Sequence, residues 1–159
     1  LGASQAAAML YENETRSQIW NAAEQAAEAL GKPLLVVGGP WGGTGSVFRR
    51  AIHAMAHGCG DTCVDMAPEA CYGCPNFIEA DIRSIPLPDS YAGAVMASHI
   101  LEHLPTVADA EAALAELHRV ADQVYIAYPT RLNLWAWMNP EHHLWVNQEA
   151  SGMMVFQQR

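Results

Sequence analysis

The stretch DIRSIPLPDSYAGAVMASHILEHLP, residues 81–105, decides the fold of this chain. It opens with an acid and a proline-rich turn, and it continues as an apolar run over residues 92–98. A continuous run of this kind is typical of a parallel strand that is covered on both faces. The run ends at Ser98 and His99, and LEH follows at residues 101–103. Because ligands bind at the carboxyl ends of strands in an open α/β sheet, this stretch predicts a binding edge.

Similar short runs predict the other strands, and they alternate with helical patterns. The first helix is expected to begin at Asn13, its cap, and to end before Gly31. Residues 1–12 form either an earlier helical turn or a frayed end, and residues 65–76 hold at most one helical turn. We expect helices at residues 13–30, 45–57 and 108–120 and strands at residues 33–38, 62–66, 76–81, 92–98, 123–128 and 152–157. This alternation predicts a mostly parallel α/β sheet with helices on both faces.

The first expected strand runs into a glycine-rich turn, GGPWGGTGS at residues 38–46. Glycine lets the backbone approach a ligand closely, and a following helix directs its free N–H groups at the same point. The turn lacks the Gly-Lys-Ser/Thr of a phosphate-binding loop and the regular Gly-x-Gly-x-x-Gly spacing. Asp65 ends the second expected strand, where a carboxylate either accepts hydrogen bonds from ribose hydroxyls or is a solvated loop acid.

Composition restricts the partners. The chain has 159 residues, a formal net charge of −9 and only eight Lys and Arg residues. Scattered basic residues cannot form a phosphate-binding face, so we expect a small-molecule ligand and no nucleic acid. No apolar run approaches the roughly 20 residues that span a bilayer, and no basic segment precedes an apolar core. We therefore expect no membrane partner and a cytoplasmic location.

The cysteines gather in one short window, as Cys59, Cys63, Cys71 and Cys74. Four thiolates suggest a zinc or iron–sulfur site, and Cys71-Tyr-Gly-Cys74 suggests a redox-active pair. The simpler interpretation places Cys63 in a buried strand and leaves all four thiols reduced, as is usual in the cytoplasm. We adopt that interpretation and expect no metal.

Five motifs in this order resemble the class I S-adenosylmethionine-dependent methyltransferases, near the methyltransferase type 11 group. They are LLVVGG at residues 34–39, Asp65, DIRSIPLPD at residues 81–89, residues 91–105 with LEH, and HRV followed by a strand up to residue 129. The portion from residue 81 to residue 105 is the more specific one, whereas the glycine motif is degenerate.

The resemblance implies a Rossmann-like fold and S-adenosylmethionine as the cofactor. One domain would span residues 1–159, with a helical segment at residues 1–31 and an α/β core at residues 32–159 that is truncated after the fifth strand. Adenine would lie between Ile82 and the glycine turn, with ribose at Asp65. The cofactor-binding residues that the resemblance implies are Gly38, Gly39, Gly42, Asp65, Met66, Asp81, Ile82 and Ser98. The implied activity is methyl transfer to a small-molecule acceptor.

Three departures from the family pattern favour an alternative. Val36 and Val37 stand where the family usually carries an acid, Pro40 and Trp41 crowd the glycine turn, and only about 30 residues follow the fifth expected strand. Trp41 would either stack on a ligand or plug the pocket. The alternative is a non-catalytic methyltransferase-like domain that serves as a binding or assembly subunit.

Three histidines are the candidate catalytic residues: His99, His103 and His142. A histidine near the end of the fourth strand can act as a general base, because its ordinary pKa is close to neutrality. His99 and His103 lie four residues apart, so on a helix they would share one face. The competing interpretation is structural, with one histidine capping the helix, the other packed, and Glu102 holding a loop.

The segment at residues 134–146 carries the last candidates. Glu141, His142 and His143 offer a metal site together with His99 or His103. We favour a loop that closes over the substrate pocket, with the tryptophans of the segment as its apolar wall. These tryptophans could also lie in the core or form an interface with a partner protein or a second copy of the chain. They are Trp135, Trp137 and Trp145.

Overall fold

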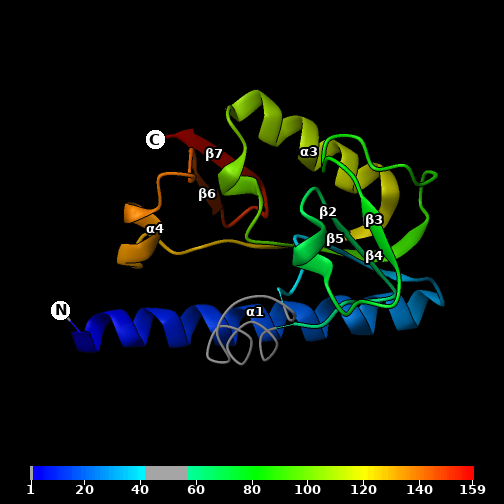
Figure 1. Ribbon diagram of the computed structural model, residues 1–159, viewed down its shortest axis with the longest axis horizontal. Coiled ribbons are helices and arrows are strands. Elements are labelled where there is room, and N and C mark those ends of the chain that lie inside the picture. The colour runs from blue at the N-terminus through cyan, green and yellow to red at the C-terminus, as the bar shows by residue number, and fades with distance from the viewer. Residues whose placement is uncertain (1, 42–56) are drawn as a thin grey trace.

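The computed structural model describes residues 2–41 and 57–159, and Figure 1 shows its ribbon. Its helices are α1 (Gly2–Leu30), α3 (Val107–Val120) and α4 (Leu134–Met138), with short 3-10 turns η1 (Pro68–Cys71) and η2 (Leu101–His103). Its strands are β1 (Leu34–Val37), β2 (Thr62–Asp65), β3 (Phe77–Glu79), β4 (Ala92–Ser98), β5 (Ala121–Ala127), β6 (Leu144–Gln148) and β7 (Met154–Gln158).

Five strands form the central sheet in the order β3-β2-β1-β4-β5, and every neighbouring pair is parallel. The expected α/β fold, with its sheet ending at the fifth strand, is confirmed. The chain runs outward from β1 to β3 and then crosses to β4 on the other side of β1. In doubly wound sheets, ligands bind where the strand order reverses in this way. The carboxyl ends of β1 and β4 therefore mark the binding crevice.

Helices cover both faces of the sheet, α1 on one side and α3 on the other (Figure 1). Leu34 and Met96 pack with Ala23 and Ala27 of α1. The alternate residues of β1 and β4 point to the opposite face of the sheet. There Leu35 and Val95 belong to one buried cluster with the apolar residues of α3. All seven residues of β4 are buried, which explains its unbroken apolar run.

The first helix is longer than expected. It begins at Gly2 rather than Asn13, so Asn13 lies inside the helix and is not its cap. The alanine-rich start has high helix propensity, and the carboxylate of Glu12 accepts hydrogen bonds from Thr130 N and Asn133 Nδ2. Gly31 follows the helix with a φ of 62°, as expected of a C′ residue. None of the described helices is long and apolar enough to span a membrane. The expected helix at residues 45–57 falls almost wholly outside the described residues.

A second sheet contains two strands, of which the sequence predicted only one. The predicted strand at residues 152–157 is β7, but it pairs antiparallel with β6, a strand that we took for a loop. Trp145 of β6 is only 6% exposed, and the guanidinium carbons of Arg131 and Arg159 lie 5.2 and 4.9 Å from the centroid of its ring. Just before β6, His143 N donates to Glu102 O at 2.8 Å. The hairpin thus brings the preceding loop to the end of β4.

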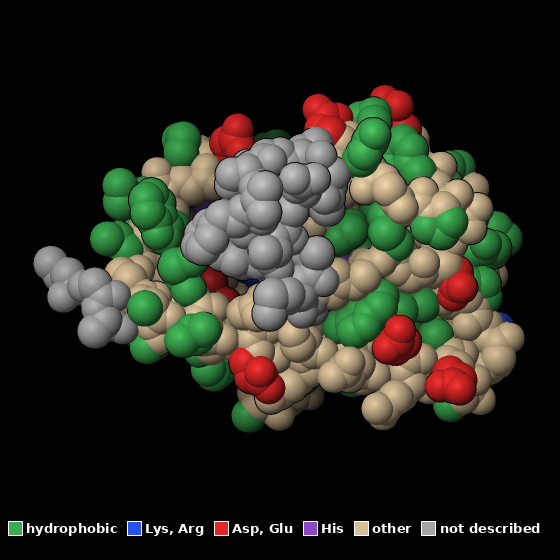
Figure 2. Space-filling model, turned by 60° about the horizontal axis from the view of Figure 1, so that its bottom comes forward, with side chains coloured by type: hydrophobic (Ala, Val, Ile, Leu, Met, Phe, Trp, Pro, Cys, Tyr) green, Lys and Arg blue, Asp and Glu red, His purple; other side chains and the backbone are tan. Residues whose placement is uncertain are grey.

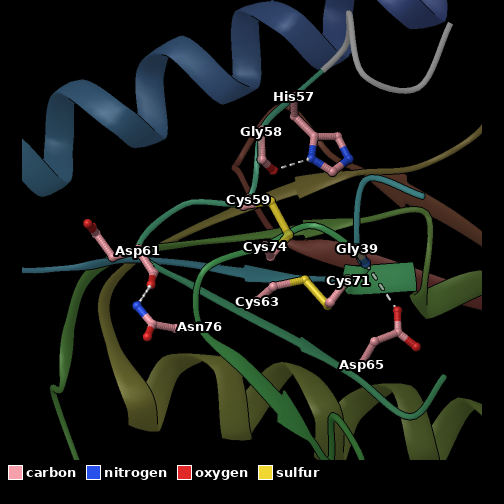
Figure 3. Close-up of a disulfide and its surroundings, with 10 residues drawn as sticks. All are labelled: Gly39, His57, Gly58, Cys59, Asp61, Cys63, Asp65, Cys71, Cys74 and Asn76. Carbon is pink, nitrogen blue, oxygen red and sulfur yellow. Dashed lines mark hydrogen bonds between the residues drawn. A yellow bond between two sulfur atoms is a disulfide. The ribbon is translucent and has the colours of Figure 1, made fainter. Parts of the chain in front are cut away.

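The described chain contains no free cysteine. Disulfides join Cys59 to Cys74 and Cys63 to Cys71 (Figure 3). The expectation of four reduced thiols is wrong, and both alternatives fail, because all four sulfurs are bonded and Cys71 does not pair with Cys74. Sequence spacing could not find this pairing, since it depends on how η1 folds back over β2. One cross-link ties η1 to β2, and the other ties the loop after η1 to the segment just before β2.

Candidate functional site

A pocket of about 650 Å³ lies at the carboxyl ends of the central strands. Every predicted site residue that the structure describes lines it. Those residues are Gly38, Gly39, Asp65, Met66, Asp81, Ile82, Ser98, His99, His103 and His142. Gly42, the remaining one, lies outside the described residues. The two carboxylates expected to hold a nucleoside thus share one pocket.

Two glycines let backbones touch at the pocket floor. Gly38 has a φ of 81°, and a Cβ there would lie 2.4 Å from the carbonyl oxygen of Ser98. A Cβ on Gly39 would lie 2.3 Å from the carbonyl oxygen of Ala70 in η1. Any larger residue would push β1 away from β4 or from η1. Trp41 N also donates to Ala70 O at 2.9 Å, and Trp41 lines the pocket without filling it.

Asp65 is held in place by backbone N–H groups. Its Oδ2 accepts a hydrogen bond from Gly39 N at 3.1 Å, and its Oδ1 accepts one from Ala67 N at 2.9 Å. Figure 3 shows this carboxylate at the end of β2, directed toward Gly39. A carboxylate oxygen has more than one acceptor position, so both oxygens can still accept from ligand hydroxyls.

Asp81 also lines the pocket, and it has a cationic partner. The guanidinium of Arg83 donates to both of its carboxylate oxygens and also reaches Asp109. The side-chain hydrogen bond from Arg83 holds the pKa of Asp81 below its usual range. The carboxylate is therefore ionised and firmly oriented. Next to it, Ile82 is only 3% exposed and offers an apolar surface to the pocket.

A buried polar chain runs from α1 to the end of β4. Arg16 Nη2 lies 2.9 Å from His99 Nε2. Since a guanidinium only donates, His99 Nε2 accepts, and the proton of a neutral ring lies on Nδ1. That atom is 3.5 Å from Glu102 Oε1, too far for a strong hydrogen bond. Glu102 is 1% exposed, and neither of its carboxylate oxygens has a hydrogen-bond partner within the described chain.

Burial is the largest influence on the pKa values of Glu102 and Arg16. It raises the pKa of Glu102 to about 8 and lowers the pKa of Arg16. Glu12 and Glu102 act in the opposite direction on the pKa of Arg16 and favour its charged form, and Arg16 favours the charged form of Glu102, whereas Glu12 raises the pKa of Glu102 further. The site therefore contains a carboxyl group that is poised between its two protonation states near neutrality.

His103 and His142 form an edge-to-face pair with ring centroids 4.7 Å apart. Each ring has its Nδ1 3.2 Å from a backbone carbonyl, that of Glu141 for His103 and that of Ala136 for His142. Burial lowers the pKa of both rings, for His142 to about 4. Both are therefore neutral at pH 7. The expected helical pairing of His99 with His103 is wrong, because η2 begins after His99, which has a φ of 50°.

The expected tryptophan wall is also wrong. The 134–146 segment does border the pocket, but through Asn139, Glu141 and His142 rather than through its tryptophans. The sequence interpretation missed Arg16 as a site residue and gave Glu102 only a loop-holding role. A signal was present, since Glu12 and Arg16 continue the helical stripe of the buried Ala23 and Ala27.

Comparison with known proteins fits this geometry. A family model described as a methyltransferase domain matches residues 42–123, just over half of the chain. The chain belongs to this methyltransferase domain family. The match confirms the resemblance to class I methyltransferases and, with it, S-adenosylmethionine as the cofactor of the family. No curated protein shows a significant similarity to this methyltransferase-family chain.

Solved structures show only a distant likeness to this methyltransferase-family chain. A protein of Methanococcus maripaludis, described as an S-adenosyl-L-methionine-dependent methyltransferase, has 12% identity and a TM-score of 0.44 over 95% of this chain and 91% of its own. The 1,6-didemethyltoxoflavin-N1-methyltransferase of Burkholderia thailandensis has 13% identity and a TM-score of 0.41 over 87% of this chain and 75% of its own. The family assignment rests on the match to the family model.

Proposed function

We propose that this protein transfers the methyl group of S-adenosylmethionine to a small-molecule acceptor. The observation that carries the proposal is the shared pocket, which Asp65, Asp81 and the three histidines all line. The carboxylates and the glycine turn suit a nucleoside. The histidines border the space that remains for an acceptor.

The residues present fit the cofactor. The free acceptor positions of Asp65 suit the two ribose hydroxyls, and the lack of side chains at Gly38 and Gly39 lets β1 lie directly against Ser98 and Ala70 at the pocket. Adenine would lie against Ile82, with its amine toward Asp81. The methionine end would then extend past Gly38 toward Ser98 and His99.

The bound cofactor supplies an activated methyl group, so the protein must orient the acceptor, exclude water and take up a proton where needed. His103 is better suited to take that proton than His99. Its Nδ1 donates to the carbonyl of Glu141, which leaves Nε2 as the free base. In His99, Nε2 already accepts from Arg16. We assign His142 a second, weaker base role, because its pKa lies further below neutrality.

A binding role without catalysis is the second candidate. It is favoured by Val36 and Val37, which are fully buried at the strand position where the resemblance leads us to expect an acid. The pocket would then hold the methionine end of the cofactor with less charge complementarity. Cofactor binding without turnover is the behaviour that this candidate predicts.

Calorimetric titration with S-adenosylhomocysteine tests the cofactor site. We expect saturable binding to the wild-type protein and roughly 10- to 100-fold weaker binding to Asp65→Ala, since hydrogen bonds to a charged group contribute about 1.5–3 kcal/mol. The matched control is Glu79→Ala, because Glu79 pairs with Asp65 in the strand register but is exposed and does not line the pocket. Circular dichroism checks that each variant is folded.

Two results would overturn the cofactor assignment: no saturable heat at millimolar ligand, or equal affinity in Asp65→Ala. A separate assay then follows S-adenosylhomocysteine release from S-adenosylmethionine with a panel of small hydroxyl and amine acceptors. Release supports the enzyme. Binding without release from any acceptor supports the second candidate.

The disulfides bear on where the protein works. Cross-links of this kind persist in oxidising compartments, whereas cytosolic reductants keep thiols reduced. The two disulfides therefore favour an oxidising surrounding over the cytoplasmic location expected from composition. Counting free thiols in protein isolated from its native host, after alkylation at lysis, tests this proposal.

A further inference from the structure

The acceptor side of the pocket holds a compact group of potential metal ligands. One nitrogen each from His103 and His142 and one carboxylate oxygen of Glu102 all lie within 4.8 Å of one another. Glu102 and His103 come from η2, and His142 comes from the loop before β6. All three line the pocket. Since ligand atoms on one ion lie about 3–4 Å apart, small rotations of these side chains would let a single ion touch all three and still face the pocket.

Both histidines are already arranged as ligands. The carbonyl oxygens of Glu141 and Ala136 can only accept, so each ring carries its proton on Nδ1 and directs it at a carbonyl. The lone pair of each ring is then on Nε2. A second-shell carbonyl that fixes the tautomer in this way is the usual companion of a metal-bound histidine.

The buried carboxylate of Glu102 has no hydrogen-bond partner in the described chain, and a bound cation would give it one interaction partner. It is almost completely buried, and both carboxylate oxygens lack a hydrogen-bond partner within the described chain. A buried carboxylate without partners is costly. Arg16 lies near enough for electrostatic attraction but donates its hydrogen bond to His99 instead. Glu12, the other charged group on this part of α1, is itself occupied by Thr130 and Asn133.

We propose that Glu102, His103 and His142 bind a divalent transition-metal ion at the acceptor end of the pocket. Two imidazoles and one carboxylate suit Zn²⁺, Co²⁺ or Fe²⁺, whereas Mg²⁺ and Ca²⁺ prefer oxygen ligands alone. Three protein ligands leave coordination positions open for water or a substrate atom. With the ion bound, Nε2 of His103 and of His142 would be a ligand and no longer a base, and a hydroxide on the ion would take up the acceptor's proton in place of His103. If the proposed methyl transfer holds, on which this step rests, the acceptor class is a molecule with a hydroxyl or carboxylate oxygen that binds the ion.

This group differs from the metal site considered from the sequence. That alternative combined Glu141, His142 and His143 with His99 or His103. In the structure, His143 is exposed and Glu141 presents its backbone carbonyl to His103. The carboxylate ligand comes from Glu102, and only the fold brings it next to His142.

Titration of the EDTA-treated protein with Co²⁺, in the absence of any cofactor, tests the site. We expect one equivalent to bind and to give a visible absorption band, which Zn²⁺ then removes by competition. Glu102→Gln and His142→Ala should each weaken Co²⁺ binding roughly 100-fold or more, since even outer-shell partners of metal ligands account for about 10- to 100-fold in affinity. His143→Ala is the matched control and should bind like the wild type.

Either of two outcomes would overturn the proposal: no Co²⁺ binding to the wild type, or the same stoichiometry and spectrum in all four proteins, which would show that surface histidines bind the ion. Thermal unfolding followed by circular dichroism identifies any variant that does not fold. If His142→Ala unfolds, Glu102→Gln decides, because it preserves the shape of the side chain. Because the titration contains no S-adenosylmethionine, its failure and the failure of the cofactor titration are separate results.

Discussion

The two sides of the pocket are built in opposite ways. On the cofactor side, the carboxylates of Asp65 and Asp81 have backbone or arginine partners, and two disulfides fasten the neighbouring turn. On the acceptor side, Glu102 is buried without a hydrogen-bond partner in the described residues, and its neighbours come from α1, η2 and the loop before β6. The cofactor side is complete by itself, whereas the acceptor side holds unsatisfied groups.

This difference shows which side of the pocket stabilises the fold and which side destabilises it. A satisfied carboxylate stabilises the fold and prepares a binding surface, whereas an unsatisfied buried one destabilises the fold until something binds it. We therefore expect changes on the cofactor side to weaken the fold and the removal of Glu102 to strengthen it.

The largest expected effect comes from the disulfides of the cofactor side. Reduction should lower the free energy of unfolding by about 3–5 kcal/mol, because a cross-link of 15 residues alone contributes about 3 kcal/mol in the chain-entropy model. It should also weaken S-adenosylhomocysteine binding, since Gly39 packs on Ala70 beside Cys71. Urea unfolding with and without reductant measures the change. A variant with all four cysteines replaced by serine should not respond to reductant, and an equal response would contradict the assignment.

A substitution at Gly39, on the same side of the pocket, should give the second-largest loss of stability. Gly39→Ala places a Cβ against the backbone of Ala70, and we expect a loss of about 2–3 kcal/mol in the free energy of unfolding, as overpacking usually costs. Gly73→Ala is the control, because its Cβ meets nothing within 4 Å and only its left-handed backbone costs about 1 kcal/mol. Equal losses in chemical denaturation would show that the contact between β1 and η1 is not tight.

Glu102→Leu tests the acceptor side and should act in the opposite direction. In metal-free buffer we expect the free energy of unfolding to rise by about 1–2 kcal/mol, because an apolar side chain replaces a buried carboxyl group without hydrogen-bond partners, and the lost attraction to Arg16 offsets only part of that gain. Glu111→Leu, at an exposed position of α3, should change it by less than about 0.5 kcal/mol. A marked destabilisation by Glu102→Leu in the same denaturation assay would mean that the carboxylate has a stabilising partner.

The smallest expected effect concerns the apolar surface beyond the acceptor side. Trp135 is 63% exposed on α4, next to the start of α1, where Gln5 hydrogen-bonds to Leu132 O and Leu134 N. Figure 2 shows hydrophobic side chains at that end of the molecule. Trp135→Ser should alter stability by less than about 0.5 kcal/mol. Following the proposal that the 134–146 segment mediates assembly, it should also delay elution from a sizing column. Identical elution of variant and wild type at all concentrations would contradict that assembly.

The sequence was sufficient for the cofactor side because chain order alone places it. Each of its residues lies at or just after the end of a short strand, and parallel strands bring their ends to one edge. Asp65 and Gly38 could therefore be assigned before any contact was known. The hydrogen bond from Gly39 N to Asp65 could not be predicted, because it depends on how closely β1 approaches η1.

The acceptor side could not be predicted in the same way. Arg16, Glu102 and His142 belong to three separate segments, and no periodicity connects them. The position of His142 depends on the antiparallel pairing of β6 with β7. The sequence pattern predicted a loop where β6 lies, so this pairing was not expected. The disulfides were missed for a related reason, because the choice among pairings of four cysteines depends on contacts that spacing does not encode.

The position of β1 has a consequence for anyone who would trim this protein. The family match begins at residue 42, after both α1 and the strand that pairs with β2 on one side and β4 on the other. A fragment cut at that boundary would lack the middle of its sheet and leave two pairs of strands, β2 with β3 and β4 with β5, without a common neighbour. The stretch that matches the family model is thus shorter than the unit that can fold.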